Sequence, residues 1–409
     1  MTNQKSYLKG WAILLLAGML ISFQITCRDE PKSADSIKTD GRDYFKELEI
    51  KPFINAGLPY STLGGSEMWP EVIEAVKYAS TRRARMKELH DAVGKKIALM
   101  VGCEAAMVSA GAASAITLGT AACMAGINLE LIRQLPDTTD MKNEVIIQKS
   151  HRYVYEQAVR CCGARILEVE TVEELEKSIN EKTVMMLFYY GREPKGEIKA
   201  KEFVAIGKKH NVPVFIDGAT TVPPADNLSK IMNLGCDLAS FSGGKGLQGP
   251  YSAGLLLGRK DLIEAARLNT SPHDSTIGRG MKVSKEEILG MMVAVEISLK
   301  RDYATDVRTG KEWMNRIADH IISIPGIKAE VFVPENADQM PRLSLKWVES
   351  VIRLTPAELV ERLREGEPSI EVVSFGQSDG LFQLSSWMLK PEEVEIVAMR
   401  LREELQKAL

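Results

Sequence analysis

The sequence has few cysteines and almost no excess charge, and each of these features excludes a class of protein. The 409 residues include 6 cysteines. None belongs to a C-x-x-C pair or has a histidine at metal-site spacing, so neither a disulfide scaffold nor a bound metal is expected. The net charge of −3 provides no basic surface for nucleic acid. With 45% hydrophobic and 26% charged residues, the composition is that of a globular protein with one large and one smaller domain.

No apolar run reaches the ~20 residues of a membrane-spanning helix, but the N-terminus has the pattern of an export signal. Two lysines precede the apolar run 11–26, and charged residues follow Cys27. Cys27 indicates a lipidated bacterial lipoprotein, although Gln24-Ile25-Thr26 lacks the usual small residue. We therefore expect residues 1–35 to be an export signal or membrane anchor, and the protein to lie in the cell envelope with membrane contact only through this segment. The alternative is a cytoplasmic protein with a fortuitous hydrophobic tail.

The rest of the chain is expected to form a tether and two domains, an α/β domain followed by an α+β domain. Residues 36–50 are a polar tether, 51–285 a large domain that begins with an arm over 51–70, and 286–409 a linking helix with a small C-terminal domain. Strands alternate with helices in the large domain, which predicts a mainly parallel sheet covered on both faces. Its expected strands are 144–149, 164–169, 183–190, 212–217, 236–242 and 253–257, and its expected helices are 70–100, 112–126, 151–162, 172–180 and 200–210. The expected elements after 285 are a helix from 286 toward 322, strands 327–333, 342–347, 370–373 and 381–384, and helices 356–364 and 391–405.

The most informative run is Ser242-Gly243-Gly244-Lys245-Gly246, which follows an expected buried strand. Glycine lets a bulky planar ligand approach the backbone, and a desolvated lysine amine forms Schiff bases with carbonyl groups. A P-loop needs serine or threonine after its lysine, and Lys245 is followed by glycine. Ser242-x-x-Lys245 also matches a β-lactamase motif, but the other motifs of that family are missing. A glycine-rich surface turn remains the alternative for this run by itself.

A second strand ends in Asp217, upstream of Lys245. Ligands of open α/β sheets bind beyond the carboxyl ends of the strands, where Asp217 is expected. An aspartate there keeps a pyridine nitrogen protonated, so that the ring can accept electrons from a substrate. A strand-end aspartate alone could equally cap a turn. Together with Lys245 it predicts pyridoxal 5'-phosphate (PLP) as the cofactor.

A helix rich in small residues is expected to begin at the run of Gly111, Ala112, Ala113 and Ser114. Backbone N–H groups at a helix N-terminus form a ready phosphate site, and the small side chains would let a cofactor phosphate approach. Ser242 could donate a further hydrogen bond. The alternative is a helix that is rich in small residues only because it packs closely on the sheet.

Other polar residues are candidates for the same site. His151 follows a strand and could lie over the pyridine ring or move a proton, or it could have only a local role at a helix start. Arg279 could bind a substrate carboxylate through two hydrogen bonds. Asn55 and Tyr60 are expected to line the pocket from the N-terminal arm.

Arg82, Arg83 and Arg85 form a further basic group. They could hold a substrate phosphate, but a solvated helix face is the simpler interpretation of three nearby arginines.

Several motifs occur in an order that resembles a known family. They are Ile54-Asn55-Ala56-Gly57, Leu63-Gly64-Gly65-Ser66, Gly102-Cys103-Glu104-Ala105, the run 110–114, Ile216-Asp217-Gly218-Ala219, the run 242–250 and the run 279–285. Over about residues 50–405 the chain resembles the bacterial selenocysteine synthase (seryl-tRNA selenium transferase)-like group of fold-type I PLP enzymes, which also contains glucosaminate-6-phosphate ammonia-lyase. The resemblance implies the PLP-dependent transferase fold, Lys245 as the Schiff-base lysine, Asp217 as the pyridine partner, and a homodimer or larger ring with active sites at the interfaces.

Two departures decide between the branches of this group. The selenium transferase carries an N-terminal tRNA-binding domain, and the export-like segment stands in that position here. The loop that begins at Asn55 is closer to the ammonia-lyase branch. The expected function is therefore a PLP-dependent lyase that catalyses an α,β-elimination on an amino acid or amino-sugar acid, with or without a phosphate, and no nucleic-acid partner is expected. The alternatives are a selenium or sulfur transferase on an aminoacyl substrate, an aminotransferase, and a non-catalytic lipoprotein of the same fold.

Overall fold

The computed structural model of this protein describes residues 41–373, 375 and 380–409. The chain divides into a unit Met1–Tyr44, described only from residue 41 onward, and a unit Phe45–Leu409 that carries the features discussed below. The expected export signal, the lipidation site Cys27 and most of the tether lie outside the described residues. No helix within the described ranges is long and apolar enough to cross a membrane.

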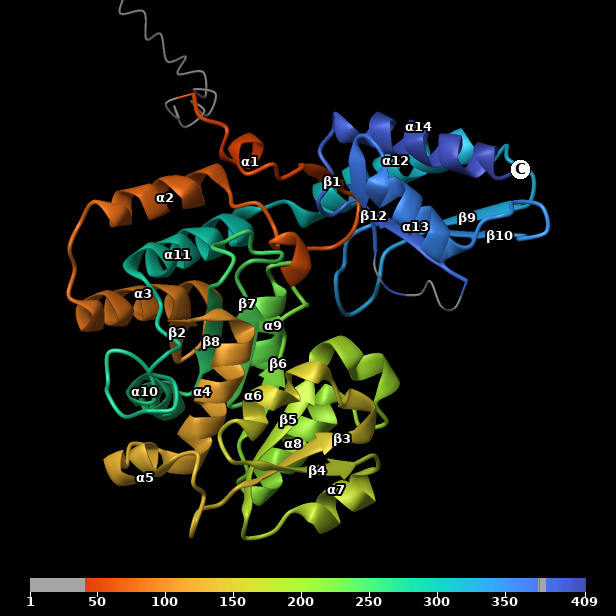
Figure 1. The fold of residues 1–409 in the computed structure, drawn as a ribbon. Coiled ribbons are helices and arrows are strands. Elements are labelled where there is room, and N and C mark those ends of the chain that lie inside the picture. The colour runs from red at the N-terminus through yellow and green to blue at the C-terminus, as the bar shows by residue number, and fades with distance from the viewer. Residues whose placement is uncertain (1–40, 374, 376–379) are drawn as a thin grey trace, which may run out of the picture. The chain divides into compact units, whose positions relative to one another are not determined.

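Within the described residues, a seven-stranded sheet forms the centre of the large domain (Figure 1). Its strands lie in the order β2 (Ala105–Ser109), β8 (Gly254–Gly258), β7 (Leu238–Ser242), β6 (Val214–Asp217), β5 (Thr183–Tyr189), β3 (Glu144–Gln148) and β4 (Arg165–Val169). The five strands from β7 to β4 are parallel, whereas β8 runs antiparallel to both β7 and β2. The prediction of a mainly parallel sheet is confirmed.

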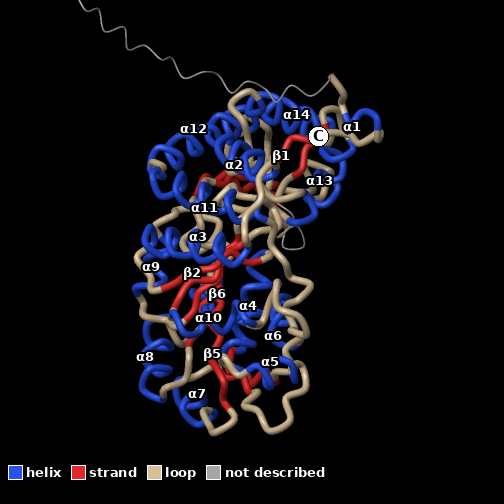
Figure 2. Tube along the Cα trace, turned by 90° about the vertical axis from the view of Figure 1, so that its left-hand side faces the viewer, coloured by secondary structure: helices blue, strands red, loops and turns tan. Residues whose placement is uncertain are grey.

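Helices cover both faces of this sheet, which explains why all its strands except the edge strand β4 are largely buried along their length. In β6, Phe215 belongs to the same apolar cluster as Ile116 of one helical layer, and Ile216 belongs to the same cluster as Phe203 of the other. Figure 2 shows the helices α4, α5 and α6 on one side of the strands and α7, α8 and α9 on the other. The helices of the large domain are α2 (Pro70–Ser80), α3 (Met86–Val101), α4 (Gly111–Ala125), α5 (Leu129–Gln134), α6 (Gln157–Arg160), α7 (Val172–Ser178), α8 (Ala200–His210), α9 (Asn227–Asn233) and α10 (Lys260–Leu268), and the short α1 (Tyr44–Glu47) precedes them.

The small domain packs helices on an antiparallel sheet. Its three strands lie in the order β12 (Phe382–Ser385), β10 (Arg342–Trp347) and β9 (Ile327–Phe332). Its helices are α12 (Tyr303–Ile321), α13 (Pro356–Glu365) and α14 (Glu393–Lys407), and α11 (Lys285–Lys300) leads into it from the large domain. The strand β1 (Phe53–Asn55) of the N-terminal arm pairs with β11 (Ser369–Glu371), so the arm joins the small domain rather than the central sheet.

Two long helices expected from the sequence are each broken in two. The run 70–100 forms α2 and α3, because the Arg82 guanidinium donates to the Tyr78 carbonyl and satisfies the end of α2. The helix expected from 286 toward 322 ends at Lys300, and Asp302 caps the following helix by accepting a hydrogen bond from the Thr305 N–H. Side chains that bond the free backbone groups of a helix end thus override the apolar pattern.

The helix expected over 151–162 is wrong. This stretch forms the 3₁₀ turns Lys149–His151 and Val154–Glu156 and only then the short α6. Tyr153 lies between the turns in an extended conformation, with φ −156°. That backbone interrupts the helix, and it is the conformation in which the Tyr153 side chain reaches the carboxylate of Asp217.

Candidate active site

A cavity of ≈ 270 Å³ opens where the carboxyl ends of β6 and β7 meet the N-terminus of α4. It is lined by six of the residues expected from the sequence, namely Lys245, Asp217, Ser242, Gly111, Ala112 and Ala113. It is also lined by Tyr155, Tyr251 and Ser252, which the sequence did not point to. The strand ends therefore bring Lys245 and Asp217 to one site, as an open α/β sheet does with its ligand-binding residues.

Asp217 is almost fully buried at the end of β6, and each of its oxygens has a donor. Oδ1 accepts from the Ala219 N–H at 3.0 Å and from Ser240 Oγ at 3.0 Å, and Oδ2 accepts from the Tyr153 hydroxyl at 2.9 Å. Burial raises the pKa of Asp217, and the hydrogen bonds and the positive charge of Lys245 oppose that rise. A buried carboxylate of this kind lacks a close positive partner, and a protonated ring nitrogen would supply one.

The Lys245 loop is fixed by hydrogen bonds to its own backbone. The Ser66 N–H donates to the Gly244 carbonyl at 3.0 Å, and Ser66 Oγ donates to the Lys245 carbonyl at 2.7 Å. The Gly243 N–H donates to the Ala253 carbonyl at 2.9 Å. The loop is therefore held through its backbone, and the side chain of Lys245 lines the cavity.

Replacing Gly246 with alanine is expected to destabilise this loop. A Cβ at this position would lie 2.1 Å from the carbonyl oxygen of Val222, which is backbone and cannot turn aside. We expect the free energy of unfolding to fall by about 1–3 kcal/mol, as for overpacked cores. Denaturant unfolding measures the change. In the matched control Gly280→Ala the new Cβ meets no atom within 4 Å, so its stability should match the wild type; equal loss in both variants would contradict the steric argument.

The N-terminus of α4 offers unpaired donors to the cavity. The N-cap residue is Ala110, whose side chain has no acceptor that could cap the N–H groups of the first turn. Gly111, the next residue, has a left-handed φ of +78°. A Cβ on Gly254 of the neighbouring strand would lie 2.5 Å from the Gly111 carbonyl carbon, so the close approach of that strand to the start of α4 requires glycine at position 254. Ser114 is buried, and its Oγ has no hydrogen-bond partner within the described chain. An orphaned hydroxyl beside free helix N–H groups fits a bound phosphate.

His151 lies outside this cavity. Its side chain is fully buried, and its ring packs edge-on against Phe188 with centroids 4.5 Å apart. Burial lowers the pKa of His151 to about 4, so the imidazole is neutral near pH 7. Two tyrosines that follow His151 contribute to the site instead. Tyr155 lines the cavity, and the Tyr153 hydroxyl donates a hydrogen bond to Asp217.

The three residues expected to bind the substrate are not among those that line the cavity. Arg279 is half exposed and donates to Asp274 at 3.1 Å and to Ser271 at 3.3 Å. The Asn55 side chain is used in its own turn, where it accepts from the Gly57 N–H at 2.9 Å. Tyr60 lies near Arg342, whose pKa its hydroxyl influences, and its neighbours Pro59 and Ser61 line the cavity.

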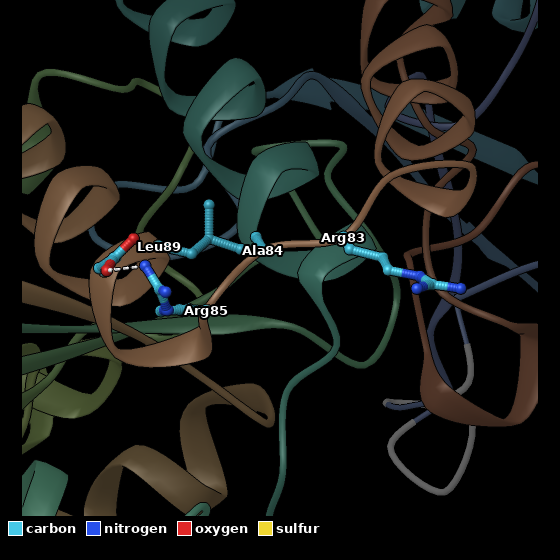
Figure 3. Close-up of a pocket in the computed structure, with 5 residues that line it drawn as sticks. Arg83, Ala84, Arg85 and Leu89 are labelled. Carbon is cyan, nitrogen blue, oxygen red and sulfur yellow. Dashed lines mark hydrogen bonds and ion pairs between the residues drawn. The ribbon is translucent and has the colours of Figure 1, made fainter.

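The arginines of the basic group between α2 and α3 line surface hollows, Arg82 with Arg83 in one and Arg83 with Arg85 in another, and neither hollow shares a residue with the Lys245 cavity. Arg82 stacks on Tyr78 at 3.9 Å, and Arg85 pairs with Glu88 at 3.1 Å. Figure 3 shows Arg83 and Arg85 pointing apart from this turn, around a surface hollow that shares no residue with the Lys245 cavity. These contacts agree with a solvated helix face.

Two charged residues of the small domain, Arg342 and Asp338, were not found from the sequence. The Arg342 side chain is only 7% exposed, and its Nη2 donates to Asp338 at 3.4 Å. Burial raises the pKa of the Asp338 carboxyl, and the positive charges of Arg342 and Lys245 oppose that rise. Asp338 therefore lies within electrostatic reach of the cavity lysine. The signal in the sequence is an arginine at the start of a strand that alternates apolar and polar residues.

Comparison with known proteins places the chain in a family. The model of the family described as aminotransferase class-V matches residues 66–275. The 5'-C-glycyluridine monooxygenase-decarboxylase of Streptomyces sp is 31% identical over 378 residues, which are 88% of this chain and 91% of that protein. This chain belongs to the aminotransferase class-V family.

Two further relatives lie in the group that the sequence resembles. D-glucosaminate-6-phosphate ammonia lyase of Salmonella typhimurium is 26% identical over 88% of this chain and 97% of its own. A solved structure of such an ammonia-lyase covers 90% of this chain and 99% of its own, with a TM-score of 0.77. L-seryl-tRNA(Sec) selenium transferase of Aquifex aeolicus is 26% identical over 51% of this chain and 52% of its own. The resemblance and the fold-type I architecture are confirmed.

This class-V protein is a PLP-dependent enzyme, and the residues of its cavity fit that cofactor. Lys245 would bond its aldehyde, Asp217 would face its ring nitrogen, and the N-terminus of α4 with Ser114 would hold its phosphate. Lys245, Asp217 and the first residues of α4 line the cavity, whereas Ser114 is not among its lining residues.

Proposed function

We propose that this class-V enzyme is a lyase that removes a group from the β-carbon of an amino acid or amino-sugar acid, with or without a phosphate. The observation that carries the proposal is the meeting of Lys245 and Asp217 at one cavity. The similarity to the ammonia lyase over nearly the whole chain supports elimination with release of ammonia.

The chemistry is shared between the cofactor and the chain. Pyridoxal phosphate, when bound, supplies an electron sink for negative charge at the α-carbon of a substrate. Lys245 brings an amine to the cavity, and we assign to it the removal of the proton from the α-carbon. Asp217, whose oxygens accept hydrogen bonds from Tyr153 and Ser240, would hold a proton on the ring nitrogen.

Arg342 is the residue that we assign to the substrate carboxylate. Its Nε is buried without a partner among the described residues, its Nη2 donates to Asp338 at 3.4 Å, and its guanidinium lies over the Phe375 ring at 5.3 Å. A guanidinium binds a carboxylate through two parallel hydrogen bonds, which fixes the orientation of the substrate as well as its charge. Arg279 is paired with Asp274 in this chain, so Arg342 is the better candidate.

The second candidate function is an oxygen-dependent decarboxylation. The 31% identity to the glycyluridine monooxygenase-decarboxylase favours it. That reaction would use the same lysine and aspartate, so the cavity does not distinguish it from elimination. Oxygen uptake and carbon dioxide release do.

The test is a substrate screen of the full chain loaded with PLP. Amino acids and amino-sugar acids, with and without a terminal phosphate, are supplied, and ammonia, 2-oxo acid, carbon dioxide and oxygen uptake are measured. We expect one ammonia for each 2-oxo acid and no oxygen uptake. Oxygen uptake with carbon dioxide release would establish the second candidate instead. Amino transfer to an added 2-oxo acid without free ammonia would make the protein an aminotransferase.

A further inference from the structure

Two tyrosines from different segments form a stacked pair beside Asp217. The Tyr153 hydroxyl donates to Asp217 Oδ2 at 2.9 Å, and the Tyr153 ring stacks on the Tyr189 ring with centroids 4.5 Å apart and an interplanar angle of 15°. Tyr189 is the last residue of β5 and is paired with Asp217 of β6 in the central sheet. The strand that lies next to Asp217 therefore carries the ring on which Tyr153 stacks.

The Tyr189 ring is itself packed on the chain that follows it. A Cβ on Gly191 would lie 3.1 Å from two carbons of this ring, so the ring and the backbone of Gly191 are in close contact. Stacked aromatic pairs have a preferred geometry and contribute beyond the apolar area that they bury. Tyr189 thus has the position and the support to fix the direction of the Tyr153 hydroxyl.

Arg192 holds the backbone of the turn that carries Tyr153. Its Nη1 donates to the carbonyl of Arg152, the residue before Tyr153, and to the carbonyl of Ser150 at 3.5 Å. A guanidinium presents several N–H donors in a rigid fork, so it can bind two carbonyl groups of one turn. The turn is thereby tied to the segment that also carries Tyr189.

This turn needs such support because it borders solvent. Tyr153, Tyr189 and Arg192 line a surface hollow of ≈ 580 Å³, which shares Tyr155 with the Lys245 cavity. Tyr153 is extended between two 3₁₀ turns, so the regular hydrogen bonding of a helix is interrupted there. Segments of this kind open most readily, unless individual tertiary contacts hold them.

The hydrogen bond from Tyr153 bears on the charge of the cofactor ring. A hydrogen bond to a carboxylate stabilises its charged form and makes it a weaker base. A ring nitrogen that faces a weaker base keeps the proton that the two groups share. Burial, which raises the pKa of Asp217, acts in the opposite direction. The direction of the Tyr153 hydroxyl therefore influences which of the two groups carries the proton.

We propose that Tyr189 and Arg192 are positioning residues, which hold the Tyr153 hydroxyl on Asp217 and so keep the proton on the ring nitrogen of the cofactor. Neither residue lines the Lys245 cavity, so both act through Tyr153. The proposal rests on the assignment of Asp217 to the ring nitrogen within the proposed function. It does not depend on the kind of reaction that the enzyme catalyses.

The experiment follows the visible absorbance of the full PLP-loaded chain against pH, without substrate. The midpoint of this titration reports the protonation of the nitrogen that joins Lys245 to the cofactor. A positive ring nitrogen disfavours a second positive charge on the same conjugated group, so loss of the ring proton should raise the midpoint. Asp217→Asn and Tyr153→Phe should both raise it and provide the reference shifts.

Tyr189→Leu and Arg192→Met should raise the midpoint as well. An aromatic stack changes an equilibrium by about 2- to 10-fold, so the shift for Tyr189→Leu should reach up to about 1 pH unit. Tyr189→Phe keeps the ring and should titrate as wild type does. The matched control Tyr190→Leu removes a neighbouring ring that lies near Phe188, and it should lower the unfolding temperature without moving the midpoint.

A double variant separates positioning from a merely structural role. If Tyr189 acts through the Tyr153 hydroxyl, Tyr189→Leu should cause no further shift in a Tyr153→Phe chain, whereas independent effects add. The kcat for the substrate that the screen identifies should follow the same pattern. Tyr189→Leu alone should lower it by about 2- to 10-fold, and it should lower it no further in the Tyr153→Phe chain.

Two results would overturn the proposal. A wild-type midpoint in Tyr189→Leu or in Arg192→Met would remove that residue from the positioning role, and additive effects in the double variant would make the role structural. If Asp217→Asn also leaves the midpoint unchanged, the assignment of Asp217 to the ring nitrogen falls too. A screen that reveals a reaction other than elimination leaves the titration intact, because the titration needs no substrate.

Discussion

Replacing Lys245 with alanine should abolish turnover and remove the visible absorbance that a lysine-bonded cofactor gives. Lys245 lines the cavity with Asp217, and its amine is the base that we assign to the α-carbon proton. Loss of both covalent attachment and proton transfer should lower kcat by about a thousandfold or more. Absorbance of the purified protein and the ammonia assay measure the two effects separately.

The control for this variant is Lys260→Ala. Lys260 is an exposed lysine at the start of α10 that is near Glu264, and its loss should leave absorbance and turnover unchanged. Lys245→Ala should also unfold at the wild-type temperature without cofactor, because the loop is held through its backbone by Ser66. A Lys245→Ala protein that keeps the visible band would show that the cofactor is bonded elsewhere.

Lys245 and Asp217 could be located from the sequence because sheet geometry brings them together. Each follows a short apolar strand, and the two strands are parallel neighbours in which Asp217 pairs with Ser240. Parallel strands end at the same edge of a sheet, so two reactive residues just beyond such ends must meet there. Ser240 could have been found by the same reasoning, since it faces Asp217 across the ladder.

Arg342 and Asp338 could not be located in this way. They come from the small domain, and the loop that carries Asp338 is positioned on the large domain by single hydrogen bonds, such as that from the Asp338 N–H to the Thr220 carbonyl. Asp338 also adopts a left-handed φ of +49°, which no periodic pattern predicts. Contacts between domains are set by such individual bonds, and they leave no repeating mark in the sequence.

The prediction of a helix from His151 onward was wrong for a related reason. The pattern after β3 has helical spacing, but the chain there is extended at Tyr153 so that its hydroxyl can bind Asp217. Tyr153 also stacks on Tyr189 with ring centroids 4.5 Å apart. A tertiary hydrogen bond to a buried carboxylate outweighs the small intrinsic preference for helix. The residue that the site uses is thus two positions after the one that the sequence suggested.

Replacing Asp217 with asparagine is expected to lower kcat by about 100- to 1,000-fold, the effect of removing one preorganised electrostatic group from an active site. Asparagine keeps the shape of the side chain and its bonds to Ser240 and the Ala219 N–H, but it carries no negative charge. Without that charge the protonated form of the buried ring nitrogen is no longer stabilised, and the ring loses much of its capacity to accept electrons. Steady-state kinetics and the absorbance of the bound cofactor measure the change.

The matched variants Ser240→Ala and Tyr153→Phe remove one hydrogen bond each and leave the carboxylate charged. Each bond to a charged group contributes about 1.5–3 kcal/mol, so these variants should lower kcat by about 10- to 100-fold, and by less than Asp217→Asn. All three should retain cofactor, because Lys245 and the N-terminus of α4 hold it at other points. If Ser240→Ala or Tyr153→Phe were as inactive as Asp217→Asn, geometry rather than charge would be the contribution of Asp217. If Asp217→Asn kept wild-type kcat, the carboxylate would have no part in the reaction, and its burial beside Lys245 would serve the fold alone.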